Sequence, residues 1–152
     1  MRTTISKEVQ FDAGHRVPDH GSKCRNPHGH RYRIVVTVGG EVVDEAGAAD
    51  NGMVVDFGDL KQWMTDLVHD RWDHGFIVYD GDPFAALLLE WVVSGDLGAR
   101  VIAEPWIPTA ENMARAIAQI LEPVITEHWR GNLELERVEV WETPTGCAAV
   151  DL

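Results

Sequence analysis

Residues 24–38 read CRNPHGHRYRIVVTV. In an extended chain, every second side chain points to the same side. From position 28 onward, one side of this stretch carries two histidines and four apolar residues: His28, His30, Tyr32, Ile34, Val36 and Val38. Apolar residues at alternate positions predict a strand with one buried face over His28–Val38. The two histidines therefore lie on the face that this strand buries.

The preceding segment, Thr3–His15, has the same alternation and ends in a third histidine. A polar loop, Arg16–Pro27, joins the two expected strands. When the strands pair as a hairpin, three imidazoles converge at one end: His15, His28 and His30. Three neutral nitrogen ligands with an open position are typical of a catalytic metal site, and zinc is the preferred ion.

Other interpretations of these histidines stay open from the residues alone. Imidazole also binds copper, iron and nickel, and single histidines are more often packed polar residues than ligands. A structural zinc site would need a fourth protein ligand, for which Cys24 is the candidate. Lys23 and Arg25 flank Cys24 and favour its thiolate form, so a base or nucleophile beside the metal is the competing role. Cys147 is interpreted as inert packing.

Helices are expected in the middle of the chain. Apolar residues recur at helical spacing over Phe57–Trp72 and again over Pro108–Val124, where Pro108-Thr109 marks a helix start. A shorter helix is expected over Phe84–Val93. Asp73–Pro83 is interpreted as a loop, and Ser94–Pro105 as irregular or extended chain.

Two further strands, Leu133–Trp141 and Cys147–Leu152, are expected around a turn at Pro144–Gly146. Two hairpins flanking helices indicate an α+β fold with an antiparallel sheet of four strands. No repeat, low-complexity segment or linker divides the 152 residues, so the sequence predicts one domain over 1–152.

Charge is distributed unevenly along the chain. The net charge of −12 argues against a general nucleic-acid binder and against docking to anionic membranes. Residues 1–33 nevertheless hold seven basic and three acidic side chains, a net +4 that leaves −16 on the other 119 residues. A basic, histidine-rich start indicates a local anion or metal site. Two cysteines and the lack of a signal-like or membrane-spanning apolar run favour the cytoplasm.

Ordered motifs extend along nearly the whole chain: Phe11-x-Ala13-x-His15, Cys24-x-x-x-His28-Gly29-His30, Met53-Val54-Val55-Asp56-Phe57 with Leu60-Lys61, Asp73-His74, Pro108-Thr109-Ala110-Glu111-Asn112 and Val140-Trp141-Glu142-Thr143. This set resembles the 6-pyruvoyltetrahydropterin synthase / 6-carboxytetrahydropterin synthase family. The spacing from Cys24 to His28 resembles its bacterial carboxy-forming branch. Two features differ from the family: Gly75-Phe76-Ile77-Val78 follows the Asp-His pair where Leu-Asn is common, and residues 81–105 form a longer, apolar insertion.

The resemblance implies a tunnelling fold (T-fold). Each subunit would supply a four-stranded antiparallel sheet with two main helices packed on one face. Sheets would join into a barrel by oligomerisation, typically as a homohexamer of two trimers, with active sites between subunits. Such joining would also pair sheet edges that are otherwise exposed.

The resemblance further implies roles for single residues. A Zn²⁺ cofactor would hold and acidify the side-chain hydroxyls of 7,8-dihydroneopterin triphosphate, and its ligands would be His15, His28 and His30. Cys24 would remove a side-chain proton as a thiolate, while His74, oriented by Asp73, would be the second acid/base.

Substrate contacts follow from the same resemblance. Glu142 would accept two parallel N–H groups from the aminopyrimidine edge of the pterin, and Thr109 and Glu111 would help to hold it. The leaving triphosphate is a candidate partner for the basic residues near the start of the chain. The candidates for binding it are Arg16, Lys23 and Arg25.

The function implied is zinc-dependent formation of 6-carboxy-5,6,7,8-tetrahydropterin, with release of acetaldehyde and triphosphate, in queuosine or other 7-deazapurine pathways. Alternatives are a 6-pyruvoyltetrahydropterin synthase, cleavage to a 6-hydroxymethyl pterin, and a non-enzymatic pterin- or purine-binding homologue. A metallohydrolase is a further alternative, and it predicts a water-activating carboxylate beside the three histidines and no need for Cys24.

Overall fold

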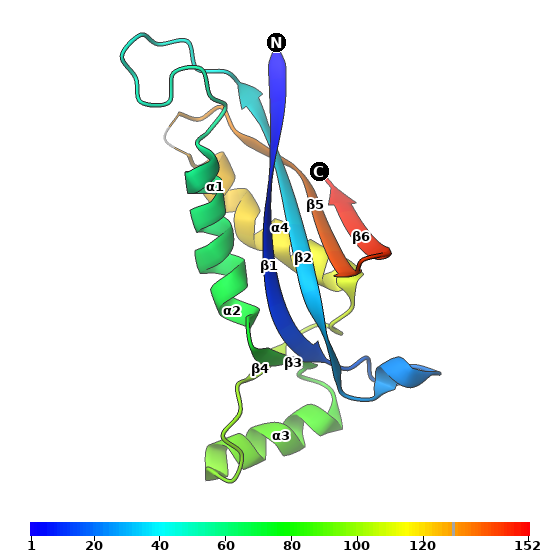
Figure 1. The fold of residues 1–152 in the computed structure, drawn as a ribbon. Helices are drawn as coiled ribbons and strands as arrows, with labels where there is room; N and C mark the ends of the chain where they lie inside the picture. Colours follow the sequence, from blue (N-terminus) through cyan, green and yellow to red (C-terminus); the bar gives the residue numbers. More distant parts are fainter. Residues whose placement is uncertain (129) are drawn as a thin grey trace.

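The first two strands form the hairpin that the alternation predicts (Figure 1). The structure, a computed structural model, describes residues 1–128 and 130–152. β1 (Arg2–His15) and β2 (His28–Glu41) pair antiparallel along their whole length, which sets His15 opposite His28. The alternate apolar residues of both strands are buried as predicted: Val9, Phe11, Ala13, Tyr32, Ile34, Val36 and Val38.

The sheet has six strands instead of the predicted four. β5 (Glu134–Thr143) and β6 (Gly146–Asp151) form the second predicted hairpin, and β5 pairs antiparallel with β2. β3 (Gly75–Tyr79) and β4 (Val101–Glu104) extend the sheet beyond β1, giving the order β4-β3-β1-β2-β5-β6. Because β3 is parallel to both β1 and β4, the sheet is mixed, and the expectation of a wholly antiparallel sheet is corrected.

β3 lies in the segment interpreted as a loop, whereas β4 lies in Ser94–Pro105, interpreted as irregular or extended chain. β3 has only five residues, and its consecutive Ile77 and Val78 are both buried, so it lacks the alternation of a half-exposed strand. The polar and turn-forming residues of Gly81-Asp82-Pro83 follow it at once. Parallel pairing depends on partners distant in sequence, which local periodicity does not reveal.

The two long helices pack on one face of the sheet, as predicted (Figure 1). α1 (Phe57–Met64) continues through a π-helical segment (Thr65–His69) into α2 (Asp70–Trp72). α4 (Ala110–Thr126) begins directly after Thr109. Together with the sheet they form one core, to which the helices contribute Leu60, Met64, Met113, Ile117 and Leu121. In the described part of the chain, no helix has the length and apolarity needed to span a membrane.

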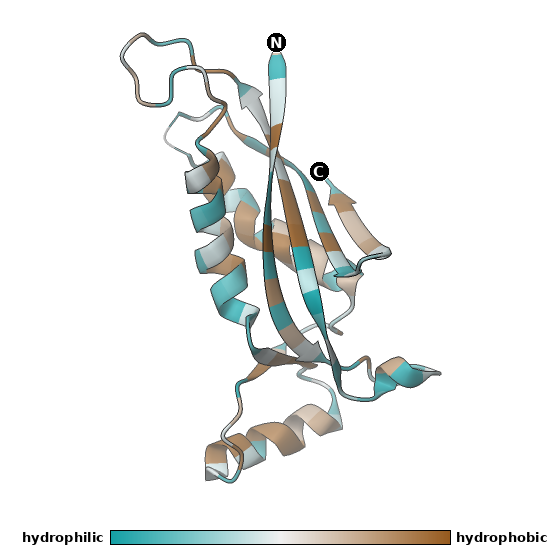
Figure 2. Cartoon of the chain, in the orientation of Figure 1, coloured by the Kyte–Doolittle hydropathy of each residue, from teal (hydrophilic) through white to brown (hydrophobic). Residues whose placement is uncertain are grey.

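α3 (Pro83–Ser94) stands apart from this core, and its ribbon is largely apolar (Figures 1 and 2). Of its residues only Ala85 is buried, and Trp91 is 46% exposed. The helix is held at its start, where Asp82 accepts a backbone hydrogen bond at 3.0 Å and pairs with Arg16 at 2.9 Å. The short helix predicted in this region is confirmed.

A buried carboxylate on β4 ties α2 to the sheet. Glu104, 3% exposed, accepts two hydrogen bonds from Arg71 at 2.9 and 3.0 Å and one from the Trp72 indole at 2.9 Å. We expect Glu104→Leu to lower the free energy of unfolding by about 2–3 kcal/mol, because the indole N–H loses its partner in the core. Urea denaturation measures the change. Glu90→Leu, at an exposed site on α3, is the control, and equal midpoints for the two variants would contradict the expectation.

Candidate metal site and catalytic residues

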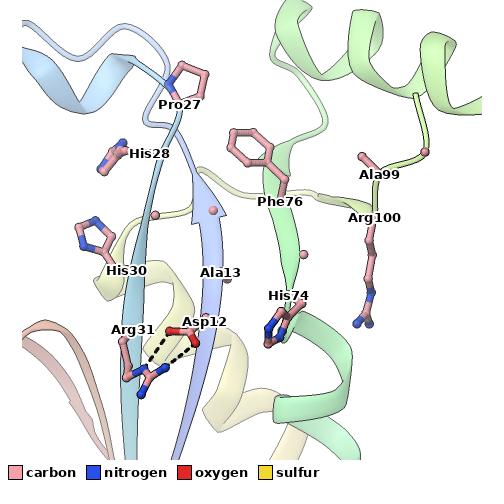
Figure 3. Close-up of a pocket in the computed structure, with 14 residues that line it drawn as sticks. Asp12, Ala13, Pro27, His28, His30, Arg31, His74, Phe76, Ala99 and Arg100 are labelled. Carbon is pink, nitrogen blue, oxygen red and sulfur yellow. Dashed lines mark hydrogen bonds and ion pairs between the residues drawn. The ribbon is translucent and has the colours of Figure 1, made fainter. Parts of the chain in front are cut away.

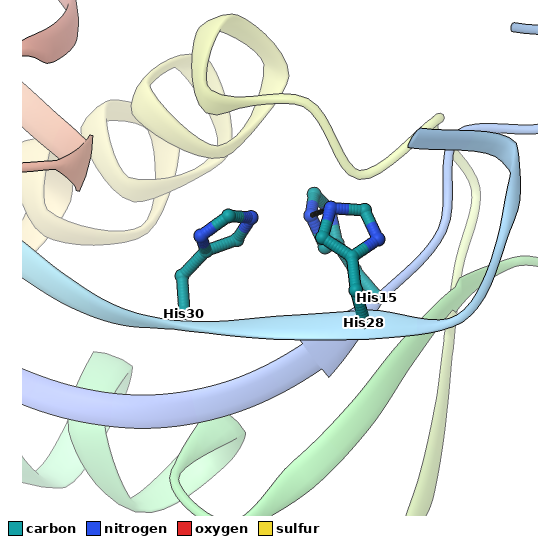
Figure 4. Close-up of side chains that lie close together, drawn as sticks. All are labelled: His15, His28 and His30. Carbon is teal, nitrogen blue, oxygen red and sulfur yellow. Dashed lines mark hydrogen bonds between the residues drawn. The ribbon is translucent and has the colours of Figure 1, made fainter. Parts of the chain in front are cut away.

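The three predicted histidines converge at one end of the β1–β2 hairpin (Figure 4). The Nε2 atoms of His15 and His28 lie 3.2 Å apart, and the ring centroids of the three imidazoles are separated by 4.5–5.1 Å. One ligand atom from each ring lies within 4.8 Å of the others, so the trio could hold a metal ion. Hairpin register causes this convergence, since His28 faces His15 and His30 faces Ala13.

Backbone carbonyls fix how two of the rings are protonated. His15 Nδ1 lies 2.6 Å from the carbonyl oxygen of Pro108, and His28 Nδ1 lies 2.8 Å from that of Asn26. Carbonyl oxygens only accept hydrogen bonds, so each Nδ1 carries a proton and donates it. In the neutral rings the two Nε2 atoms then present lone pairs to each other. That pairing is repulsive unless a proton or a metal cation lies between them, and an Nδ1–H bound to a carbonyl is the arrangement of metal-bound histidines.

A carboxylate adds negative charge to the same place. Glu142 Oε1 lies 3.1 Å from His15 Nε2 and 3.3 Å from His30 Nε2. Contact with His15 lowers the pKa of the Glu142 carboxyl, which is therefore ionised. Partial burial lowers the pKa of His30 and favours its neutral, metal-binding form. Its Nε2 is buried without a hydrogen-bond partner among the described residues. This donor set fits a divalent cation.

The predicted pterin contact Thr109 lies next to this cluster, because it directly follows the carbonyl that binds His15. Its Oγ1 accepts a hydrogen bond from Asn112 N at 3.4 Å and caps α4. Glu111 is exposed in the first turn of the same helix. Cys24 is a half-buried free thiol in a short helical turn, Lys23–Arg25, between β1 and β2.

The predicted triphosphate-binding cations differ in their surroundings. Lys23 and Arg25 are exposed in the turn that contains Cys24. Arg16 instead packs over the Phe84 ring, 5.0 Å from its centroid, and pairs with buried Asp82. Arg16 thus joins the end of β1 to the start of α3, whereas Lys23 and Arg25 face solvent.

The predicted acid/base pair is formed at the end of α2. His74 Nδ1 lies 2.7 Å from Asp73 Oδ2, and Asp73 Oδ1 accepts the backbone N–H of Asp12 at 3.1 Å. Burial raises the pKa of the Asp73 carboxyl, but hydrogen bonds from His74 and the Asp12 amide lower it. The pKa therefore lies below its usual value. The His74 side chain is 79% exposed, so this dyad is open to a ligand.

Within this subunit, the dyad and the histidine trio lie on different sides of β2. His74 lines a cavity of about 880 Å³ together with Arg31, Phe76 and Arg100, and His28 and His30 line the same cavity. Figure 3 shows His28 and His30 on one side of β2, and His74, Phe76 and Arg100 on the other. The His74 side chain therefore lies across β2 from those of His28 and His30, although all three residues border one cavity.

Sequence reasoning missed the groups that support these side chains. The carbonyls of Asn26 and Pro108 set the histidine tautomers, and no sequence signal marks a carbonyl acceptor. Arg100 donates to the backbone of Asp73 at 2.8 Å, although nothing in the local pattern singles it out. The sequence did not predict that Glu142 lies near the histidines. Its position on β5 is consistent with that contact, because Glu142 shares a face with Val138 and Val140, which are buried.

Comparisons with known proteins agree with this arrangement. Curated relatives named 6-carboxy-5,6,7,8-tetrahydropterin synthase include one from Haemophilus influenzae, 34% identical over 93% of both chains, and one from Rickettsia bellii, 32% identical over 91% of this chain and 93% of the relative. An uncharacterized protein from Wolinella succinogenes has the same fold, with a TM-score of 0.77 and 25% identity over 99% of this chain and 98% of its own. A 6-pyruvoyl tetrahydropterin synthase from Caenorhabditis elegans also shares the fold, with a TM-score of 0.67 and 24% identity over 100% of this chain and 96% of its own.

The family comparison covers both hairpins, the histidine trio and the Asp-His dyad. The profile described as 6-pyruvoyl tetrahydropterin synthase matches residues 4–151, which is almost the entire chain. The curved sheet with helices on one face is the T-fold subunit that the sequence motifs imply, enlarged by two strands. By this match over residues 4–151, the chain belongs to the 6-pyruvoyl tetrahydropterin synthase family.

Proposed function

We propose that this protein is a zinc-dependent lyase that converts 7,8-dihydroneopterin triphosphate, with uptake of water, to 6-carboxy-5,6,7,8-tetrahydropterin, acetaldehyde and triphosphate. The observation that carries the proposal is the histidine trio: the Nδ1 atoms of His15 and His28 are bound to carbonyls, and the three rings bring ligand atoms close enough together to hold a metal ion. The names of the relatives support the carboxy product. A product of this kind belongs to queuosine or other 7-deazapurine biosynthesis, and the free thiols of Cys24 and Cys147 suit the reducing cytoplasm.

Each residue then has a chemical task. His15, His28 and His30 would hold the zinc, which supplies Lewis acidity to the substrate hydroxyls when bound. Glu142 is an ionised acceptor beside the trio and suits the adjacent N–H donors of the pterin edge. Cys24 would accept a side-chain proton, and Lys23 and Arg25 beside it would hold the triphosphate.

A neighbouring subunit would complete the site. The His74 side chain lies across β2 from those of His28 and His30 in its own chain, and we propose that it serves as acid/base for the trio of another subunit. The edge strands β4 and β6 offer unpaired backbone groups that suit the joining of sheets into a barrel. We propose a homohexamer of two trimers on this basis.

The proposal is tested by incubating zinc-loaded protein with 7,8-dihydroneopterin triphosphate and identifying products by mass spectrometry. Carboxytetrahydropterin with stoichiometric acetaldehyde supports it. A pyruvoyl or hydroxymethyl pterin would assign another activity within the family, and no turnover at any zinc concentration would count against an enzyme. A metallohydrolase is the second candidate, because Glu142 lies beside the histidines as a water-activating carboxylate would; hydrolysis of the triphosphate alone would favour it.

Glu142→Gln is expected to lower kcat/KM by about 100-fold, mainly through KM, because the amide loses a charged acceptor worth about 1.5–3 kcal/mol. Metal content should stay at the wild-type level. Steady-state kinetics and atomic emission spectrometry measure the two quantities. Glu139→Gln, on the same strand and paired with Arg137, is the control. A variant with normal KM and no metal would show that Glu142 acts on the metal instead of the pterin.

A further inference from the structure

The backbone at His74 is strained. Its φ is +54°, in the left-handed region that non-glycine residues adopt at a cost of about 1–3 kcal/mol. Such a conformation persists only when the surroundings fix it. It turns the chain sharply between the end of α2 and the start of β3, and thereby sets the direction of the His74 ring.

Hydrogen bonds to β1 and to the π-helical segment Thr65–His69 hold one side of this turn. The His74 N–H donates to the carbonyl of Asp12 at 2.7 Å, and the Asp73 N–H donates to that of His69 at 2.8 Å. The Asp12 N–H in turn donates to the Asp73 carboxylate at 3.1 Å. These contacts fix the amide groups of the turn. The backbone carbonyl groups on its other side still need hydrogen-bond donors.

One guanidinium satisfies that other side. Arg100 Nη1 donates to the carbonyl of Asp73 at 2.8 Å, and its Nη2 donates to the carbonyls of Asp70 at 2.6 Å and Arg71 at 2.8 Å. The last carbonyls of a helix lack intrahelical partners and carry partial negative charge. A planar cation with several donors suits three converging carbonyls, whereas a lysine ammonium acts as a point charge.

The backbone of Arg100 is itself fixed. Its carbonyl accepts the N–H of Phe76 on β3 at 2.9 Å, immediately before β4 pairs with the same strand. Arg100 thus reaches from the inserted segment 81–105 to the helix end from a rigid position. It also lines the cavity that His74 faces.

We propose that Arg100 is a positioning residue, which clamps the end of α2 and holds the strained turn so that His74 is aimed for proton transfer. The proposal rests on the proposed function, in which His74 is the second acid/base. It gives the inserted segment a task beyond packing, because this segment supplies both the clamp and the β4 strand that anchors it.

Kinetics provide the first test. Arg100→Ala should lower kcat by about 10- to 100-fold, the effect of a displaced catalytic group, with KM changed by less than about twofold. Arg100→Lys should recover part of the loss. In a His74→Ala background, Arg100→Ala should lower kcat by less than about a further twofold. The effects of two residues that act through one another do not add. Arg115→Ala, at an exposed site on α4, is the control and should match wild type.

Amide hydrogen exchange provides a test that does not depend on turnover. Arg100→Ala should speed exchange at the Asp73 and His74 amides by on the order of tenfold and leave β2 and α4 unchanged. Evenly faster exchange across the protein would reduce Arg100 to a general structural role and overturn the proposal. So would a rise in KM at constant kcat, which would make Arg100 a substrate contact, or full additivity with His74→Ala. Absence of turnover in the wild type would reject the proposed function, while local exchange at His74 would still decide whether the clamp exists.

Discussion

His28→Ala is expected to abolish high-affinity metal binding and, with it, turnover. The side chain supplies one of three nitrogens whose lone pairs converge, and its Nδ1 is already committed to the Asn26 carbonyl. Zinc peptides with four ligands bind with about 10–16 kcal/mol, so the loss of one ligand should cost on the order of 3 kcal/mol, or 100- to 1000-fold in Kd.

Isothermal titration of metal-stripped protein with zinc measures this change, and product formation should fall in parallel. Removal of the ion by a chelator should stop turnover of the wild type, and zinc should restore it. His20→Ala is the matched control, because His20 lies exposed in the β1–β2 connection, its side chain accepts a hydrogen bond from the Ser22 amide, and it is not among the proposed ligands. Wild-type zinc affinity in His28→Ala would exclude the trio as the metal site.

Cys24→Ala is expected to lower kcat by about 100- to 10,000-fold, which is the usual contribution of a general base. Zinc affinity should stay at the wild-type value, since the described metal cluster contains three histidines and no cysteine. Cys24 lies half-buried in the turn just before β2, and Lys23 and Arg25 flank it. This turn joins the two strands that carry the three histidines.

Cys147→Ala is the control for Cys24→Ala, because Cys147 is the other free thiol and lies exposed on β6. Steady-state kinetics and zinc titration separate three outcomes. A lower kcat of Cys24→Ala with unchanged zinc affinity would support Cys24 as the general base. Lost zinc would make Cys24 a ligand, as in a structural site, and full activity would favour the metallohydrolase, which needs the carboxylate of Glu142 but no thiol.

Much of the fold followed from local periodicity. Alternation identified β1 and β2, helical spacing identified α1 and α4, and an apolar stretch indicated α3. β3 and β4 did not follow, because Ile77 and Val78 are adjacent buried residues and the pairing partners of both strands lie far away in sequence. Short buried parallel strands carry no alternation that distinguishes them from an apolar loop.

The sequence also did not reveal which acidic residues pair with the basic residues near the start of the chain. Residues 1–33 carry a net +4, which indicated a local anion site. In the folded chain Arg16 pairs with Asp82, and Arg2 pairs with Glu134 and Glu136, all acids outside residues 1–33. Cross-strand and long-range neighbours therefore neutralise part of that charge, and Lys23 and Arg25 are left as the exposed members of the predicted set.

The sequence by itself determined that three histidines share the buried side of a hairpin, because side-chain direction in a strand depends only on position parity. It also determined the Asp-His dyad as a pair of neighbours. Tertiary structure alone decided that Glu142 reaches the histidines, that His74 lies across β2 from them, and that Arg100 clamps the strained turn. Those contacts join residues dozens of positions apart, and their geometry comes from packing and strand order, which no local pattern encodes.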